Sequence, residues 1–301
     1  MLPAEDWETV VVTGGTGFLG RRLRARLSSD RRVVDVVSPE RLATQQATRA
    51  IGSRSTPTEF ARHIGDTASI LIFHLATRYV PSGAPYDVDQ LVESNVAFPS
   101  RLVEGAVATG ARVRVVNPST LFQYFGESRD LPISLYAATK EAFRAVLRGY
   151  AVTRDVCIAD LVLGDTYASD DPRPKLVPHL LRCEQTGESV SLGSGRQVMS
   201  LMHADDVVDA LLAAGSLPSP AFAEDRFRTW ALAGSATLTV AELVSLVQAA
   251  RGGRPSCSFD ASRDRPHEMM HGLDALDLET LPGFVARRSL RSLLEDAAVG
   301  D

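Results

Sequence analysis

The chain has 301 residues and a formal net charge of -5. Hydrophobic residues make up 45% of it and charged residues 23%, a balance that is typical of a folded globular protein and that excludes the disordered and fibrous classes. No long run of lysines and arginines stands out. We therefore expect no nucleic-acid partner.

Neither a secretion signal nor a membrane helix is expected. The first residues are acidic and lead into an apolar run, without the basic segment that precedes a signal. The longest apolar runs, such as residues 70–76, are far shorter than the roughly 20 residues that a membrane helix requires. Cys157, Cys183 and Cys257 lack the paired spacing of a metal site. The sequence thus predicts a cytoplasmic protein with reduced cysteines, no membrane contact and no metal.

In the first half of the chain, short β-branched runs alternate with longer helical patterns. This alternation is typical of βαβ units that build a parallel sheet. The runs carry adjacent apolar residues, as strands buried on both faces do. The expected strands are residues 9–13, 32–37, 69–75, 112–117 and 156–163, and the expected helices are 20–28, 88–109 and 135–151. The fold class predicted is α/β, a Rossmann fold with a doubly wound parallel sheet.

After residue 164 the regular alternation of strand and helix patterns ends, and three prolines occur between 172 and 178. Residues 202–214 have the apolar pattern of a return to the core, and 239–251 that of an amphipathic helix that begins at Thr239, with Glu242 three positions later. We predict a large domain at 1–164, to which 198–233 returns, and a smaller C-terminal lobe formed by 165–197 and 234–301.

A glycine-rich segment follows the first expected strand and opens a helix. Its glycines permit a tight turn and a close approach of the backbone to a pyrophosphate, while the amides at the start of the helix receive the phosphates. A strand before it and a helix after it favour a dinucleotide site over the alternative, a purely structural turn. The residues expected to contact this cofactor are Gly14, Thr16, Gly17, Phe18, Leu19 and Gly20.

The end of the second strand indicates which dinucleotide is bound. An acidic residue there would hold the ribose 2'-hydroxyl of NAD, but the position is occupied by Ser38, with Arg41 close behind. A hydroxyl and a guanidinium suit the 2'-phosphate of NADP, whereas Asp35 lies inside the strand. NADP(H) is therefore the preferred cofactor and NAD(H) the alternative, which holds if Arg41 is only a solvated loop residue.

Tyr136 and Lys140 stand four residues apart and so share one face of a helix. The positive charge is expected to stabilise the phenolate and lower the pKa of the tyrosine toward the working pH, which suits proton transfer at a carbinol or carbonyl. The preceding strand ends at Asn117-Pro118-Ser119-Thr120, which places hydroxyls at the carboxyl edge where such sheets bind ligands.

These motifs resemble, in order and spacing, the extended short-chain dehydrogenase/reductase family, also known as the NAD-dependent epimerase/dehydratase family. The resemblance covers about two thirds of the chain, from Thr13 to Asp206, and includes the glycine segment, His74-Leu75-Ala76-Thr77, Asn95-Val96, and Tyr136 with Lys140. It implies that Leu75, Ala76, Thr77, Tyr136 and Lys140 also contact the cofactor, that the large domain binds NADP, and that the smaller lobe binds the substrate.

The resemblance also implies a catalytic set. Thr120, Tyr136 and Lys140 form the triad, with Ser119 as the alternative hydroxyl, and Asn95 bends its helix and orders a water behind Lys140. Relatives commonly pair two long helices into a dimer, so a homodimer is expected.

A narrower likeness is to the reductases that act on the 4-keto group of nucleotide-linked deoxysugars, such as CDP-abequose and CDP-paratose synthases. It rests on residues 117–123, 135–140, 163–167 and 171–176. It implies a nucleoside-diphosphate 4-keto-6-deoxyhexose, dTDP- or CDP-linked, as substrate. Met199 stands where many relatives have an arginine, and Arg173, Lys175 or Arg196 would supply the missing positive charge. The residues expected to bind the substrate are Tyr79, Thr120, Tyr136, Lys175 and Arg196.

The resemblance leaves several reactions open. Dehydratases of the family carry an acid pair directly after the catalytic threonine, where this chain has Leu121 and Phe122, so dehydration is not expected. NADPH-dependent 4-ketoreduction is the function predicted. The alternatives are an NAD-dependent nucleotide-sugar epimerase and a non-catalytic NADP-binding regulator.

Overall fold

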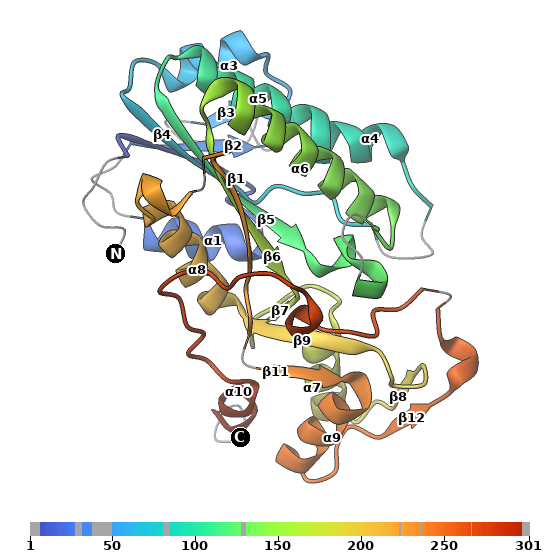
Figure 1. Ribbon diagram of the computed structural model, residues 1–301. Helices are drawn as coiled ribbons and strands as arrows, with labels where there is room; N and C mark the ends of the chain where they lie inside the picture. The colour runs from blue at the N-terminus through green and yellow to red at the C-terminus, as the bar shows by residue number, and fades with distance from the viewer. Residues whose placement is uncertain are drawn as a thin grey trace.

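A large parallel sheet with helices on both faces forms most of the molecule, and a smaller unit lies at one end of it (Figure 1). The structure is a computed structural model that describes residues 7–27, 32–37, 50–80, 85–127, 131–222, 224–234, 236–265 and 267–296. The seven strands of the large sheet lie in the order β10-β6-β5-β4-β1-β2-β3 and pair in parallel. They are β1 Thr9–Thr13, β2 Arg32–Val37, β3 Ala50–Gly52, β4 Ser69–His74, β5 Arg112–Thr120, β6 Cys157–Leu163 and β10 Phe227–Ala231. The predicted Rossmann fold is confirmed.

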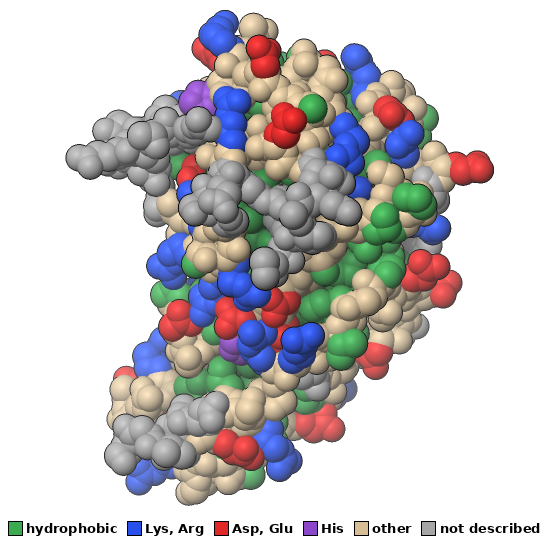
Figure 2. Space-filling view, turned by 90° about the vertical axis from the view of Figure 1, so that its left-hand side faces the viewer, with side chains coloured by type: hydrophobic (Ala, Val, Ile, Leu, Met, Phe, Trp, Pro, Cys, Tyr) green, Lys and Arg blue, Asp and Glu red, His purple; other side chains and the backbone are tan. Residues whose placement is uncertain are grey.

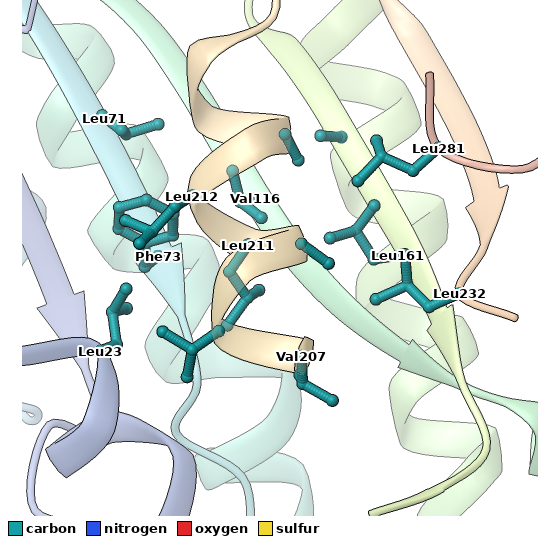
Figure 3. Packing of buried hydrophobic residues seen from close by; sticks show 14 of the residues in the cluster. Leu23, Leu71, Phe73, Val116, Leu161, Val207, Leu211, Leu212, Leu232 and Leu281 are labelled. Atoms are coloured by element: carbon teal, nitrogen blue, oxygen red, sulfur yellow. The ribbon is translucent and has the colours of Figure 1, made fainter. Parts of the chain in front are cut away.

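Successive side chains of the buried strands point into two separate cores, one on each face of the sheet. Helices α1 (Phe18–Arg26) and α8 (Ala204–Ser216) cover one face, and α3 (Pro57–Ile64), α5 (Phe98–Ala108) and α6 (Leu135–Arg154) cover the other. Figure 3 shows Leu211 of α8 over the sheet, between Phe73 of β4 and Leu161 of β6. All three side chains are fully buried, and each such burial stabilises the fold by about 1.5–3 kcal/mol.

The expected helix at 88–109 is divided by a π-helical turn. Helix α4 (Val88–Val92) leads into the turn η1 (Glu93–Ala97), and α5 follows. Pro99, in the first turn of α5, has no N–H to donate to the carbonyl one turn earlier, so the regular hydrogen-bond ladder cannot continue through this point. The π turn contains Asn95, one of the predicted site residues.

Strand β3 and helix α3 were not predicted. Helix α3 nevertheless has a strong local signal, because Thr56 and Glu59 form a reciprocal capping box and Pro57 occupies the first turn. β5 also continues three residues beyond the expected end, to Thr120, because 117–120 pair with 160–163 of β6.

The smaller unit contains two short sheets and three helices. Its strands are β7 Asp165–Tyr167, β9 Val198–His203 and β11 Ala236–Thr239 in one sheet, and β8 Val190–Leu192 and β12 Cys257–Phe259 in the other. Its helices are α7 Leu176–Thr186, α9 Val240–Ala250, capped by Thr239 and Glu242 as expected, and α10 Leu290–Asp296.

The structure draws the boundary between the units differently from the predicted division at two points. The segment 198–233 does return to the large sheet through α8 and β10, but its first part, β9, pairs with β7 and β11 instead. Conversely, Thr280 bridges to Ala231 of β10, and Leu281 packs in the core of the large domain.

Ion pairs connect the helices of the large domain to the C-terminal segment. Arg26 of α1 lies 2.6 Å from Asp209 of α8, and Arg288 binds Asp206 and Asp209 of the same helix. Figure 2 shows acidic and basic side chains side by side on the face that it presents. Among the described helices, none is long and apolar enough to cross a membrane.

Candidate functional site

The glycine segment forms the turn between β1 and α1. Gly14 has φ +67°, and a Cβ atom there would lie 2.7 Å from the amide nitrogen of Ala76. A Cβ on Gly20 would lie 2.0 Å from the carbonyl oxygen of Gly14. Glycine is therefore required at both positions, because the backbone of the turn is packed against the β4 end and against the first turn of α1.

The start of α1 fits a dinucleotide. Gly17 is its N-cap, no side-chain hydrogen bond caps it, and its first turn contains no acidic residue. The amides of Phe18 and Leu19 thus belong to an uncapped positive helix end next to a turn in which three of the four residues are glycines, which is the environment that a pyrophosphate needs. The predicted cofactor residues Gly14, Thr16 and Gly17 lie in this turn.

His74 at the end of β4 fixes the neighbouring cofactor segment. The amide of Ala76 donates to Thr13 Oγ1 at 2.9 Å, and Thr13 Oγ1 lies 2.9 Å from His74 Nδ1. Burial, together with the charge of Lys140, lowers the pKa of His74 to about 3, so the imidazole that shares this hydrogen bond is neutral. These contacts hold the predicted cofactor residues 75–77 opposite Gly14.

The residues that should select NADP lie outside the part of the chain that the structure describes, so Ser38 and Arg41 have no assigned position. Asp35 is described, inside β2, where its carboxylate lies 3.0 Å from Arg24 Nε. Burial raises the pKa of Asp35 even though Arg24 opposes this effect. Its carboxylate is thus held by α1 and lies beside the glycine turn, where a Cβ atom on Gly15 would lie 3.0 Å from Asp35 Oδ1.

Tyr136 and Lys140 lie on one buried face of α6, which begins at the N-cap Ser134. Burial lowers the pKa of Lys140 to about 8, an effect that the charge of Asp160 opposes. Burial raises the pKa of Tyr136 to about 12, and a hydrogen bond with Thr77 only partly offsets this effect. The expected lowering of the tyrosine pKa by Lys140 is therefore wrong for this structure, since desolvation of the phenolate dominates.

Asn95 joins the cofactor segment to α6. Its Oδ1 accepts from the amide of Arg78 at 2.7 Å, and its Nδ2 donates to the carbonyl of Arg78 at 3.1 Å and to Thr139 Oγ1 at 3.0 Å. Thr77 Oγ1 donates to the same Oδ1 at 3.3 Å. Asn95 thus holds residues 77–78 against the helix that carries Tyr136. The π turn at Asn95 is consistent with the expected bend of its helix.

The two candidate hydroxyls differ in their surroundings. Ser119 is buried, and its hydroxyl donates to the fully buried carboxylate of Asp160. Thr120 is half-buried at the end of β5, and its Oγ1 accepts from the amide of Phe122 at 3.3 Å, which leaves its proton for another acceptor. The structure therefore favours Thr120 as the hydroxyl that faces a ligand.

The predicted substrate residues are not all gathered at one place. Tyr79 packs edge-on against Tyr136, with ring centroids 5.1 Å apart, and Lys175 Nζ lies 4.9 Å from the centroid of Tyr79. These three therefore form one group. Arg196 is separate, because its side chain is 71% exposed and lies 3.6 Å from Asp264.

The cations considered for a diphosphate have carboxylate partners. Lys175 Nζ lies 3.7 Å from Asp165, and Arg173 forms a bidentate pair with Asp171 while its guanidinium covers the ring of Phe18 at 4.1 Å. Arg173 therefore lies beside the cofactor turn.

A pocket beside Tyr79 contains residues that the sequence did not reveal. It is lined by Tyr79, Val80, Phe122, Ile133, Ser134, Gln197, Arg265, His267, Glu268 and Met269. Arg265 is the arginine among these lining residues. These side chains come from separate segments of the chain without a shared pattern, so a sequence motif could not have identified them together.

A model of the family described as "NAD dependent epimerase/dehydratase family" matches residues 10–224. The chain belongs to this family. The matched range includes the glycine turn and all the expected catalytic residues, which are Asn95, Thr120, Tyr136 and Lys140.

Several proteins are similar to this chain in sequence or in fold. CDP-abequose synthase of Yersinia pseudotuberculosis is 23% identical over 210 residues, which cover 67% of this chain and 71% of the relative. The structure of MoeE5 in complex with UDP-glucose and NAD is 26% identical, with a TM-score of 0.73 over 95% of this chain and 96% of that one. A UDP-N-acetylglucosamine 4-epimerase from Methanobrevibacter ruminantium M1 is 16% identical, with a TM-score of 0.75 over 97% of both chains, and so shares the fold.

Proposed function

We propose that this member of the NAD dependent epimerase/dehydratase family reduces the 4-keto group of a nucleoside-diphosphate 4-keto-6-deoxyhexose with NADPH. The observation that carries the proposal is the buried pair of Tyr136 and Lys140 at the carboxyl edge of the sheet, beside the cofactor segment. A tyrosine with a pKa raised to about 12 is protonated at neutral pH, and a protonated phenol is the acid that ketone reduction requires.

Each site residue has a distinct role in this reaction. The glycine turn and residues 75–77 would hold NADPH, which would supply a hydride for the reduction of C4. Tyr136 donates its proton to the O4 oxygen, and Thr120 donates a hydrogen bond to the same atom, where negative charge develops. Lys140, with a pKa lowered only to about 8, stays largely protonated at neutral pH and binds the nicotinamide ribose.

Dehydration is disfavoured by the residues after Thr120. Leu121 is buried and Phe122 lines the pocket beside Tyr79. Neither side chain can exchange a proton, so elimination of water from the sugar would lack its acid and base at these positions.

The preference for NADPH is supported by the residues in β2 and directly after it. Asp35, the acidic residue of β2, lies inside the strand and pairs with Arg24. Ser38 and Arg41, which follow β2 in the sequence, suit a 2'-phosphate.

The substrate class is supported by the pocket and by the similarity to CDP-abequose synthase. Arg265 lines the pocket and Lys175 lies against the ring of Tyr79, and a diphosphate is bound by such donors. In this proposal the sugar is linked to dTDP or CDP. Arg196, which lies apart from Tyr79 and Lys175, would contact only the outer end of the nucleotide. The exposed apolar residues Val88 and Val92 of α4 and Val152 of α6 support a homodimer through these helices.

A second candidate is a nucleotide-sugar 4-epimerase with retained NAD. The similarity to MoeE5, solved with UDP-glucose and NAD, favours it. An epimerase oxidises C4 and then reduces it again with the same tyrosine, so net consumption of added NADPH is what distinguishes the two reactions.

The test is oxidation of NADPH by the purified protein with a panel of dTDP-, CDP- and UDP-linked 4-keto-6-deoxyhexoses, with NADH in parallel. Stoichiometric oxidation with a keto sugar supports the reductase. Interconversion of UDP-glucose and its C4 epimer without added reductant would replace it by the epimerase. Binding of NADPH with neither reaction would point to a regulator.

A further inference from the structure

A charged residue is buried at the centre of β6, between apolar neighbours. Asp160 has no exposed surface. Its Oδ2 lies 3.0 Å from Nε of Arg144, which is itself 4% exposed, and its Oδ1 accepts from Asn117 Nδ2 at 2.8 Å and from the Ser119 hydroxyl. A buried ion pair contributes little to stability compared with well-packed apolar side chains, so its presence in this strand calls for another explanation.

Besides the contact of Asp160 with Ser119, a chain of hydrogen bonds connects Arg144 to the backbone of Thr120. Arg144 Nη1 donates to Glu141 Oε2 at 3.1 Å, and Gln123 Nε2 donates to the same oxygen at 2.6 Å. Gln123 Oε1 then accepts from the amide of Thr120 at 3.0 Å. Ser119, which binds Asp160, directly precedes Thr120 in the chain. The contacts therefore form a closed ring. We call the five side chains the polar ring: Ser119, Gln123, Glu141, Arg144 and Asp160.

The polar ring connects the elements that carry the three proposed catalytic groups. It joins the end of β5, which carries Thr120, to α6, which carries Tyr136 and Lys140. It also joins both of these elements to β6 through Asp160. Gln123 is also fully buried, so water does not compete for its bonds.

We propose that the polar ring positions the Thr120 hydroxyl against Tyr136 and Lys140, with Gln123 and Asp160 as positioning residues for the reaction. This inference rests on the proposed function, because it assigns Thr120 to the reacting oxygen. A loss of alignment of about 1 Å at a reacting group costs up to about a hundredfold in rate, which is the scale of effect that a positioning network controls.

The charge of Asp160 has a second consequence. Lys140 is buried, and its charge lowers the pKa of the neighbouring His74, which is uncharged at neutral pH. The carboxylate of Asp160 raises the pKa of Lys140 against the effect of burial. Loss of that charge would therefore reduce the protonated fraction of the lysine.

The test compares Gln123→Met with Tyr150→Phe. Gln123→Met keeps the length of the side chain and removes both of its links in the polar ring, while the pair of Arg144 and Asp160 remains. The control, Tyr150→Phe, removes a hydrogen bond of 2.9 Å from the same helix to Glu104 but lies outside the ring. Ser119→Ala is a milder ring variant, should Gln123→Met fold poorly.

Two readouts separate positioning from general destabilisation. With whichever sugar nucleotide the wild-type protein converts, we expect Gln123→Met to lower kcat by about tenfold to a hundredfold, with KM and the Kd of the cofactor within about twofold. Amide hydrogen exchange in residues 119–124 should accelerate at least about tenfold in this variant and stay unchanged in Tyr150→Phe.

The hydrogen-exchange readout needs no turnover, so it tests the ring even if the wild-type protein converts no sugar nucleotide and the proposed function fails. Unchanged exchange in 119–124 in both ring variants, or equal losses of kcat in Tyr150→Phe, would overturn the inference.

Discussion

Tyr79 stands edge-on to Tyr136, with the ring planes at 81° and the centroids 5.1 Å apart. The same Tyr79 ring lies 4.9 Å from the ammonium of Lys175, which in turn lies 3.7 Å from Asp165. A single aromatic side chain thus connects the proposed proton donor of the large domain to a cation of the smaller unit. Tyr79 also lines the pocket, so in the proposed reaction it would contact both the substrate and Tyr136.

Replacement of Tyr79 should impair turnover through this contact. Tyr79→Leu removes an edge-to-face pair, of about 0.5–1.5 kcal/mol, and a cation–π contact of about 0.5–1 kcal/mol, so we expect kcat/KM to fall about tenfold. Tyr79→Phe retains both ring contacts and should stay within about twofold of wild type. Steady-state kinetics on both variants check this, and an equal loss in Tyr79→Phe would mean that the hydroxyl binds substrate directly.

The charge of Lys140 should set the alkaline limit of activity. Burial lowers its pKa to about 8, so the cation is present below that pH and is lost as the pH rises through it. The phenol of Tyr136, with a pKa of about 12, does not titrate in this range. We expect kcat/KM to decline above about pH 8. In Lys140→Arg, whose guanidinium stays charged, any residual activity should show no such decline; a decline at the same pH would assign it to another group.

The turn at Gly14 should tolerate no side chain. Gly14→Ala places a Cβ atom 2.7 Å from the amide of Ala76, in addition to the strain of φ +67°, and we expect cofactor binding to weaken by about tenfold to a hundredfold. Gly110→Ala is the matched control, since its φ is +77° but its Cβ atom would meet nothing within 4 Å. It should cost about 1 kcal/mol of stability and leave the Kd of the cofactor unchanged. Fluorescence titration with NADPH measures both; equal Kd values for the two variants would contradict the close-packed turn.

The neutral His74 should make the fold sensitive to acid. Its folded pKa, about 3, lies below the unfolded value of about 6.5, so its contribution to stability is complete above about pH 6.5 and is lost as the pH falls toward 3. At about pH 5 this amounts to about 2 kcal/mol of the free energy of unfolding. Urea unfolding of His74→Asn should show a correspondingly smaller loss between neutral pH and about pH 5. His267→Gln, at an exposed position, is the control and should behave as wild type.

Much of the fold was predictable from local pattern. The apolar runs of β1, β4 and β6 identify buried strands because both faces of the sheet are covered by helices, and the glycine turn was recognisable because steric demands fix those residues. The capping box of Thr56 and Glu59 could have indicated helix α3, but the prediction relied on apolar periodicity and did not use it. The π turn depends on Pro99, which is visible in the sequence, although its effect on the register is not.

The site was predictable only where its residues share one element. Tyr136 and Lys140 were found from helical spacing, but the raised pKa of Tyr136 comes from burial, which spacing does not report. The polar ring joins α6 to β6 and to the end of β5, so no spacing rule links Arg144 to Asp160. The pocket residue Arg265 likewise meets Tyr79 only in the folded chain.

The most direct test of the proposed reduction is transfer of deuterium from NADPH labelled at its transferable position to a nucleotide-linked 4-keto-6-deoxyhexose, read by mass spectrometry and NMR of the product. The account predicts one deuterium at C4 of the product, and no transfer by Tyr136→Phe even though that variant still binds NADPH. A C4-epimerised sugar without net label from added NADPH, or full transfer by Tyr136→Phe, would contradict it.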